Sequence, residues 1–124
     1  MHTAMTHMST LLAEVTHIET GKLECGSSSS WTGREYGYDF YHNEHFRYTT
    51  VTQQFSKPYG RVPRVQWGVT HVYYYDNSGN YLIYNVDVVK VTETSFTVKC
   101  RIEDHSAFLL RGMTVSWASF PNEM

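Results

Sequence analysis

The feature of this sequence that most restricts its fold is a series of six segments in which apolar and polar side chains alternate with a period of two. In the longest of them, residues 64–75, Val65, Trp67 and Val69 share one face of the expected strand. No helical pattern lies between the segments, and most of the connections are short and rich in turn residues. Consecutive strands joined in this way predict an antiparallel sandwich or a small barrel. The six segments are 16–25, 47–55, 64–75, 81–91, 95–102 and a last strand that contains Met113, Val115 and Trp117 after a loop at 103–112.

The composition indicates a single domain with a surface suited to recognition. The chain has 124 residues, ten tyrosines, 18% charged residues and a formal net charge of −2, and this length is enough to bury a self-sufficient core. Basic residues are scattered, which argues against nucleic-acid binding, because that function needs a basic face. Tyrosine offers a broad contact area with a polar tip, so a surface rich in tyrosine and poor in charge is typical of binding modules.

Two further features bear on where the protein works. No apolar run is long enough to span a bilayer, so we expect no membrane insertion, and residues 1–15 lack the basic start and continuous apolar stretch of a secretory signal. The only two cysteines, Cys25 and Cys100, lie in strand-like segments. Two cysteines placed in strands favour an oxidising compartment, and we therefore expect a secreted or extracellular protein. If the two cysteines pair with each other, there is a single connectivity.

Residues 1–15 differ in pattern from the expected domain at 16–124. The apolar residues Met5, Met8, Leu12 and Val15 stand at spacings of three, four and three, which makes a short heptad stripe. A helix of this length is marginal in water and needs partners. We therefore expect either a tail or a short helix that forms a trimeric bundle with other copies of the chain.

An ordered set of short motifs resembles the H-type lectin domain family over residues 18–120. The set begins at Gly21 and includes both cysteines. Its members are Gly21-Lys22-x-x-Cys25-Gly26, Trp31, Arg47, Phe55-Ser56-x-Pro58-Tyr59, Pro63-Arg64-Val65, Thr94-Ser95-Phe96, Cys100 and Met113-x-Val115-Ser116-Trp117.

The resemblance implies a fold, an assembly and a ligand. It implies a six-stranded antiparallel β-sandwich, a Cys25–Cys100 disulfide, and a trimer or dimer of trimers that binds N-acetylgalactosamine or galactose-type glycans between subunits, without a cofactor. In some family members a cysteine after the Pro-Tyr pair links two trimers. Gly60 stands at that position here, so we do not expect a covalent hexamer.

The family's first sugar-binding loop holds an acidic residue that accepts hydrogen bonds from sugar hydroxyls. Carboxylates suit this role because each oxygen accepts a donor from neighbouring hydroxyls. Here the loop follows Trp31, and Gly37-Tyr38-Asp39 keeps the family's Gly-x-Asp form. Counting back from Arg47 selects Glu44 instead. Asp39 is the preferred candidate, and the alternative is that it caps a turn through its own side chain.

The other binding positions depart from the family's pattern. Ile83 stands where the family has an arginine, and Glu103-Asp104-His105 stands where it has a Trp-His pair. Arg111 falls where the family has an aromatic residue from the neighbouring subunit, and its guanidinium offers paired hydrogen bonds to vicinal hydroxyls. Asp104 and His105 would still supply polar contacts to a sugar. An apolar contact for the sugar would come from Tyr36, Tyr38 or Phe108.

Other chemistries receive little support from the sequence. The run His42-Asn43-Glu44-His45 matches no helical zinc signature, so we expect no metal site. Asp104, His105 and Ser106 lack the nucleophile elbow and oxyanion-hole glycines of a hydrolase, so we expect no enzyme. The two hypotheses are a glycan-binding lectin with sites between subunits, and a trimeric structural or protein-interaction module that has lost the sugar site.

Overall fold

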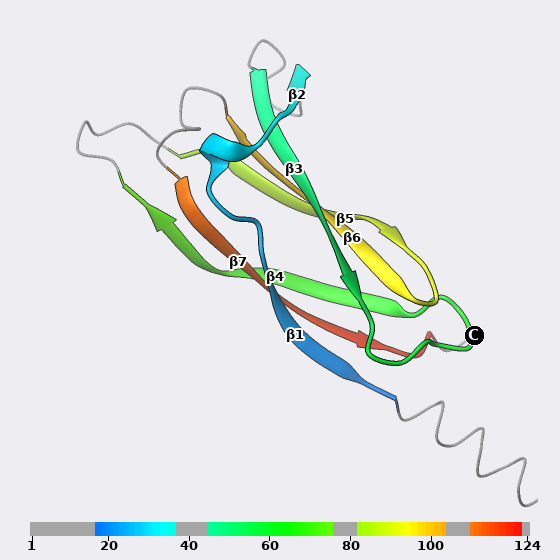
Figure 1. The fold of residues 1–124 in the computed structure, drawn as a ribbon. Helices are drawn as coiled ribbons and strands as arrows, with labels where there is room; N and C mark the ends of the chain where they lie inside the picture. Colours follow the sequence, from blue (N-terminus) through cyan, green and yellow to red (C-terminus); the bar gives the residue numbers. More distant parts are fainter. Residues whose placement is uncertain (1–16, 37–44, 76–81, 104–109, 123–124) are drawn as a thin grey trace, which may run out of the picture.

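The computed structural model describes residues 17–36, 45–75, 82–103 and 110–122. Within these ranges the chain forms two antiparallel sheets that pack face to face (Figure 1). One sheet has the strand order β1-β7-β4 and the other the order β2-β3-β6-β5. The elements are β1 (Glu19–Glu24), the short 3-10 helix η1 (Ser28–Ser30), β2 (Gly33–Tyr36), β3 (His45–Gln54), β4 (Arg64–Tyr74), β5 (Tyr84–Val91), β6 (Ser95–Glu103) and β7 (Leu110–Phe120).

The sandwich prediction is confirmed, but the predicted count of six strands is wrong for the described residues, which form seven. The additional strand is β2, which lies inside the loop that the sequence predicts after Trp31. It pairs along β3 from Gly33 opposite Tyr48 to Tyr36 opposite His45. The predicted N-terminal helix at 1–15 lies outside the described residues.

The core fills the space between the two sheets, and β6 shows most directly how the sequence produces it. Phe96, Val98, Cys100 and Ile102 alternate along this strand and are fully buried. This is the period-two pattern of a strand with one face in the core. Around one end of the strand, the rings of Phe55, Phe96 and Trp117 contact one another at centroid distances of 5.0–6.2 Å. The rest of the buried core is Leu23, Cys25, Trp31, Tyr59, Leu110, Met113 and Val115.

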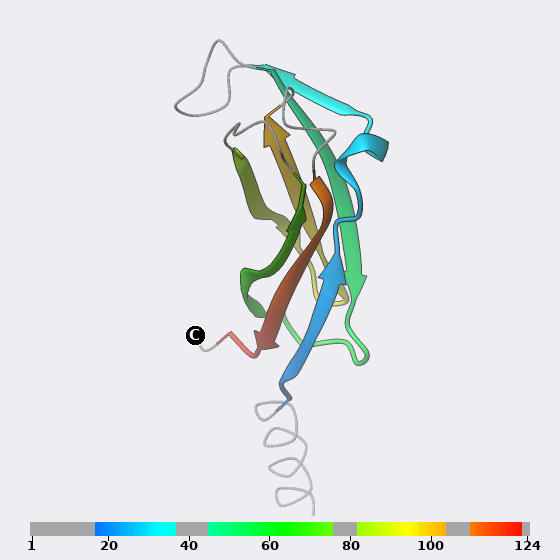
Figure 2. The ribbon, with the colours of Figure 1, turned by 90° about the vertical axis from the view of Figure 1, so that its left-hand side faces the viewer.

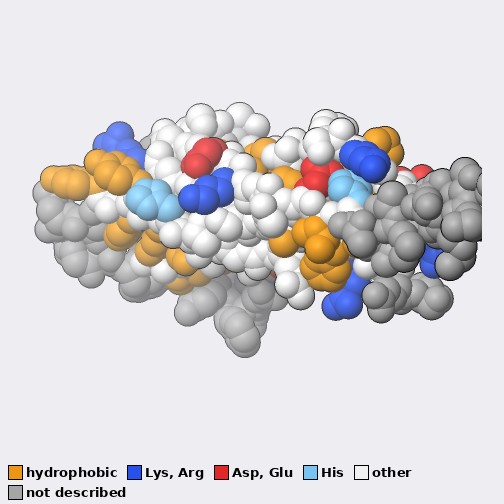
Figure 3. All heavy atoms as spheres, turned by 90° about the horizontal axis from the view of Figure 1, so that it is seen from below, with side chains coloured by type: hydrophobic (Ala, Val, Ile, Leu, Met, Phe, Trp, Pro, Cys, Tyr) orange, Lys and Arg blue, Asp and Glu red, His pale blue; other side chains and the backbone are white. Residues whose placement is uncertain are grey.

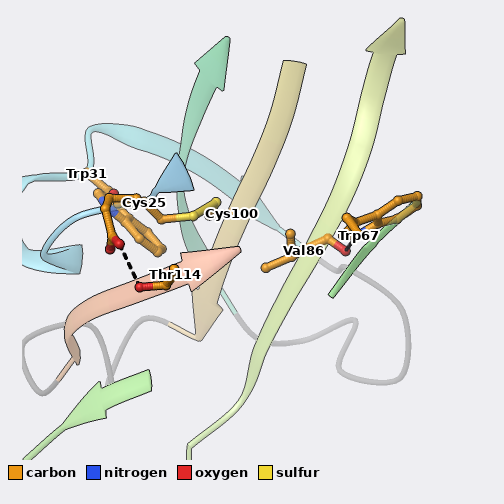
Figure 4. Close-up of a disulfide and its surroundings, with 7 residues drawn as sticks. Cys25, Trp31, Trp67, Val86, Cys100 and Thr114 are labelled. Atoms are coloured by element: carbon orange, nitrogen blue, oxygen red, sulfur yellow. Dashed lines mark hydrogen bonds between the residues drawn. A yellow bond between two sulfur atoms is a disulfide. The ribbon is translucent and has the colours of Figure 1, made fainter. Parts of the chain in front are cut away.

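A disulfide between Cys25 and Cys100 joins the two sheets. Cys25 directly follows β1, in the three-stranded sheet, and Cys100 lies in β6, in the four-stranded sheet. The Trp31 indole lies beside the bond and donates a 2.9 Å hydrogen bond to the carbonyl of Cys25 (Figure 4). The bond implied by the family resemblance is therefore present, and it fixes the first strand against the penultimate one.

Two irregularities in the β4–β7 ladder change which side chains face the core. Val69 pairs with Val115 and His71 with Thr114, so one extra residue of β4 shifts the alternation and brings Val72 to the core side with Val69. Further along, Tyr73 pairs with Gly112 and Tyr74 with Leu110. One residue of β7 is therefore extra at that point. The last strand begins at Leu110, so the predicted loop at 103–112 is too long at both ends.

Trp67 shows where the sandwich is open. β4 and β5 are edge strands of opposite sheets, and Trp67 of β4 remains 41% exposed although its register partner Trp117 is buried. Its indole Nε1 reaches the carbonyl of Val86 in β5 at 3.4 Å, and Figure 4 shows the two residues side by side. The side chain thus lies across the open side between the sheets instead of entering the core. Among the described residues, no helix is long and apolar enough to cross a membrane.

Candidate functional site

The predicted binding segments connect strand ends at one extremity of the sandwich. β2, β4 and β6 end there, and β3, β5 and β7 begin there (Figures 1 and 2). Loops on a rigid β scaffold commonly carry binding residues. The topology therefore brings three connections that are far apart in sequence to the same end of the domain.

Most of the predicted site residues belong to these connections. Gly37, Tyr38, Asp39 and Glu44 follow β2 in the sequence, and Asp104 and His105 follow β6. All six lie outside the described residues, as do His42 and Phe108, so their roles stay predictions. Tyr36 is described at the end of β2, where its exposed ring lies 4.6 Å from the ring of His45.

Arg111 is the predicted site residue that the structure does describe. It lies near the start of β7 and is the extra residue between the pairs Tyr73–Gly112 and Tyr74–Leu110. Bulges of this kind commonly redirect a side chain beside a binding site. Together with Tyr73 and Tyr75, Arg111 lines an open depression of about 270 Å³.

Tyr73 and Tyr75 were not predicted as site residues. They are 59% and 58% exposed, and because they are two residues apart they lie on the same side of the chain, away from the core. The sequence contained only a partial signal for them. Three consecutive tyrosines, 73–75, end a strand with one buried face, so at least one of the three rings lies outside the core. Regular alternation after Val69 would leave Tyr74 outside, and the extra residue of β4 exposes Tyr73 and Tyr75 instead.

The electrostatics of Arg111 differ from those of the buried arginine in the neighbouring sheet. Arg101 is 7% exposed and hydrogen-bonds Glu35 at 2.8 Å and Asp87 at 2.9 Å. Arg111 is exposed and has no carboxylate partner among the described residues. Its guanidinium is therefore available for a ligand.

The four-stranded sheet carries a charge network that attaches β2, the strand that precedes residues 37–44. Glu35 of β2 forms ion pairs with Lys99 and Arg101 of β6. Burial tends to raise the pKa of Glu35, but the hydrogen bonds and positive charges of these two residues outweigh it, and the pKa is lowered. The ammonium of Lys99 also lies 4.1 Å from the centre of the Tyr48 ring. The carboxylate is thus held ionised where it joins two strands.

Comparison with protein families decides the identity. The family model for the H-type lectin domain matches residues 50–120, more than half of the chain. The chain belongs to the H-type lectin domain family. The family is one of carbohydrate-binding, non-enzymatic proteins. The match includes Cys100, Tyr73, Tyr75 and Arg111. A comparison with curated proteins found no match.

The structure describes two of the positions at which this H-type lectin domain departs from the family's pattern. Ile83 is half-buried, and its carbonyl accepts a 2.9 Å hydrogen bond from the backbone N–H of Glu103. Glu103 is 1% exposed and is the last residue of β6, opposite Phe46. The sequence prediction placed Glu103 in a loop, and that prediction is wrong because the β3–β6 ladder continues to this residue. Neither side chain replaces an exposed arginine or tryptophan as a sugar contact.

The other described surfaces of this lectin domain lack the features of a metal site or a nucleic-acid site. Within the described ranges, no group of three or more His, Cys, Asp or Glu side chains is arranged to hold a metal ion. Figure 3 shows the molecule from below, the side on which β1, β4 and β7 lie in Figure 1. The few acidic and basic side chains on this face lie close to one another among uncharged ones. This face therefore has no broad basic surface of the kind that nucleic acids need.

Proposed function

We propose that this protein is a lectin that binds galactose or N-acetylgalactosamine-type glycans at one end of the sandwich. This is the end at which β2, β4 and β6 finish, called the loop-bearing end below. The observation that carries the proposal is the match to the H-type lectin domain over residues 50–120. The depression lined by Tyr73, Tyr75 and Arg111 lies at that end and supports it. An exposed tyrosine ring offers an apolar surface to the C–H groups of a sugar, and a guanidinium donates paired hydrogen bonds to its hydroxyls.

We further propose that each site is completed by a neighbouring subunit in a homotrimer, or in a dimer of trimers. The depression is open and lined by few described side chains, which suits a site shared between copies. Exposed apolar side chains on the edge strands β4 and β5, namely Trp67, Tyr84 and Val89, are candidates for the subunit contact. Several weak sites presented together would bind a glycan-covered surface by avidity.

The test of sugar binding is a panel of multivalent glycans offered to the full chain and to two variants. We expect binding to galactose-type glycans, and loss of binding in Arg111→Ala and in Asp39→Ala. Arg61→Ala is the matched control, because Arg61 is exposed in the connection before β4, at the opposite end of that strand. Absence of binding to any glycan at high multivalent concentration would refute the proposal.

The second candidate is a trimeric protein-interaction module without a sugar site. The burial of Glu103 and the apolar side chain of Ile83 favour it, because the family contacts expected at these positions are missing. A trimeric mass in solution combined with no glycan binding would select this candidate. A monomeric mass would refute both the shared site and the trimeric module.

A further inference from the structure

The chemistry of Arg111 suits an anion better than a neutral sugar hydroxyl. A guanidinium binds a carboxylate or another oxyanion through two parallel hydrogen bonds, and such charge-assisted bonds are roughly twice as strong as neutral ones. Since the described part of the chain provides no carboxylate for Arg111, a bound anion would have no competitor among those residues. Arg34 differs in this respect, because its guanidinium donates hydrogen bonds to the carbonyls of Trp31 and Gly33.

The residues around Arg111 also give it a defined position beside a depression, unlike an isolated charge on the surface. The bulge places it between two register pairs of the β4–β7 ladder, so its position is fixed by a paired sheet. Tyr73 and Tyr75 lie with it around one depression and contribute two phenol hydroxyls, each a hydrogen-bond donor. A volume of about 270 Å³ is near the lower end of ligand pockets, roughly 300 Å³, and fits one sugar unit.

We propose that Tyr73, Tyr75 and Arg111 form a subsite for the anionic group of an acidic glycan, either a sugar carboxylate or a sulfate ester. The proposal rests on the lectin function proposed above and specifies its ligand class. Arg111 binds the oxyanion through its two parallel N–H donors, and the tyrosines donate to the remaining oxygens and cover the sugar ring.

The experiment compares matched glycans that differ only in the acidic group. Immobilised galactose-terminated glycan, its sialylated form and its 3-O-sulfated form are titrated with the full chain by biolayer interferometry at low and at high salt. We expect wild type to prefer at least one acidic form by about tenfold, which corresponds to one additional charge-assisted interaction. The preference should decrease at high salt, because the site is open to solvent.

Three variants separate a specific subsite from a general effect of charge. Arg111→Gln should weaken binding of all three glycans and remove the difference in affinity between the acidic and the neutral forms. Arg111→Lys should retain part of this difference, because the charge stays but the paired geometry is lost. Arg61→Gln removes the same charge from the opposite end of β4 and should change nothing. Thermal unfolding of each variant checks that the exposed substitutions leave the fold intact.

Each outcome of the titrations supports or overturns the proposed subsite. A preference for the sialylated form alone assigns a carboxylate, and a preference for the sulfated form alone assigns a sulfate ester. Equal binding of acidic and neutral forms by wild type would overturn the subsite and leave the lectin function standing. An equal loss of preference in Arg61→Gln would also overturn it, because net charge would then explain the effect. Absence of binding to all three glycans would overturn both proposals.

Discussion

Removal of the Cys25–Cys100 bond is predicted to cost this domain a large part of its stability. The bond closes a chain segment of 75 residues, and the loop-entropy relation gives about 4.5 kcal/mol for a loop of this length at 25 °C. Domains of this kind have unfolding free energies of about 5–15 kcal/mol. The reduced protein is therefore expected to be marginally folded, with its sheets no longer held by a covalent link.

The assay is urea unfolding of three forms of the protein: oxidised wild type, reduced wild type and the double variant Cys25→Ala/Cys100→Ala. Reduced wild type keeps both sulfur atoms in the core, so its difference from the oxidised form isolates the effect of the cross-link. The alanine variant adds the loss of side-chain packing at Cys100, which is fully buried. Fluorescence is a suitable signal, because Trp31 hydrogen-bonds the carbonyl of Cys25.

Two numbers from these curves test the entropic explanation. The unfolding free energy should fall by about 4–5 kcal/mol on reduction, and the m-value should rise because the uncross-linked denatured chain exposes more surface. A loss below about 1 kcal/mol on reduction would refute the reasoning, since the denatured chain would then be restrained without the bond.

Two further predictions concern local packing and pH. Gly33→Ala should lower the unfolding free energy by about 1–3 kcal/mol in a urea titration, because a Cβ at Gly33 would lie 2.5 Å from the Tyr48 ring; an unchanged midpoint would show that the ring moves freely. Burial tends to raise the pKa of Glu19, but hydrogen bonds from the Ser56 and Lys57 backbone and from His17 outweigh it, so the folded pKa lies below the unfolded value. The carboxylate therefore stabilises the fold above the unfolded pKa of about 4.3, and this contribution is lost as the pH falls through the lower, folded pKa. Melting curves of wild type and Glu19→Gln should differ near neutral pH and converge in acid, and a gap independent of pH would contradict the assignment.

The strands that the sequence predicts well are those whose alternation is complete. The alternation of Phe96, Val98, Cys100 and Ile102 is regular in the sequence and predicts most of β6, and the structure buries all four residues. The start of β7 could not be predicted in the same way. The extra residue Arg111 breaks the alternation before Met113, so the pattern becomes regular only after the strand has begun.

β2 was missed because nothing local in its sequence indicates a strand. Its four residues have no regular apolar alternation, and its attachment depends on Glu35 reaching Lys99 and Arg101, which are 64 and 66 residues away. Tyr48 also packs over Gly33 and covers the place where a side chain is missing. Such contacts exist only after the two sheets have formed, so a reading of the local pattern does not detect them.

The candidate site was predicted in part. The family resemblance singled out Arg111, whose exposure and place beside Tyr73 and Tyr75 the structure adds. The tyrosines were assigned to a strand without an assignment of the face that each ring occupies. Regular alternation would have given the wrong face, because the irregularity after Val69 inverts it. Glu103 was placed in a loop because the length of β6 depends on pairing with β3 and not on its own sequence.

The most direct test of the proposed lectin site is the affinity of the full chain for one galactose-type glycan presented multivalently, measured for wild type, Arg111→Ala and Arg61→Ala on the same surface. We predict that wild type and Arg61→Ala bind alike and that Arg111→Ala loses binding, since Arg111 lines the depression at the loop-bearing end. Equal binding by all three proteins would contradict the placement of the site. No binding by wild type would contradict the lectin function itself.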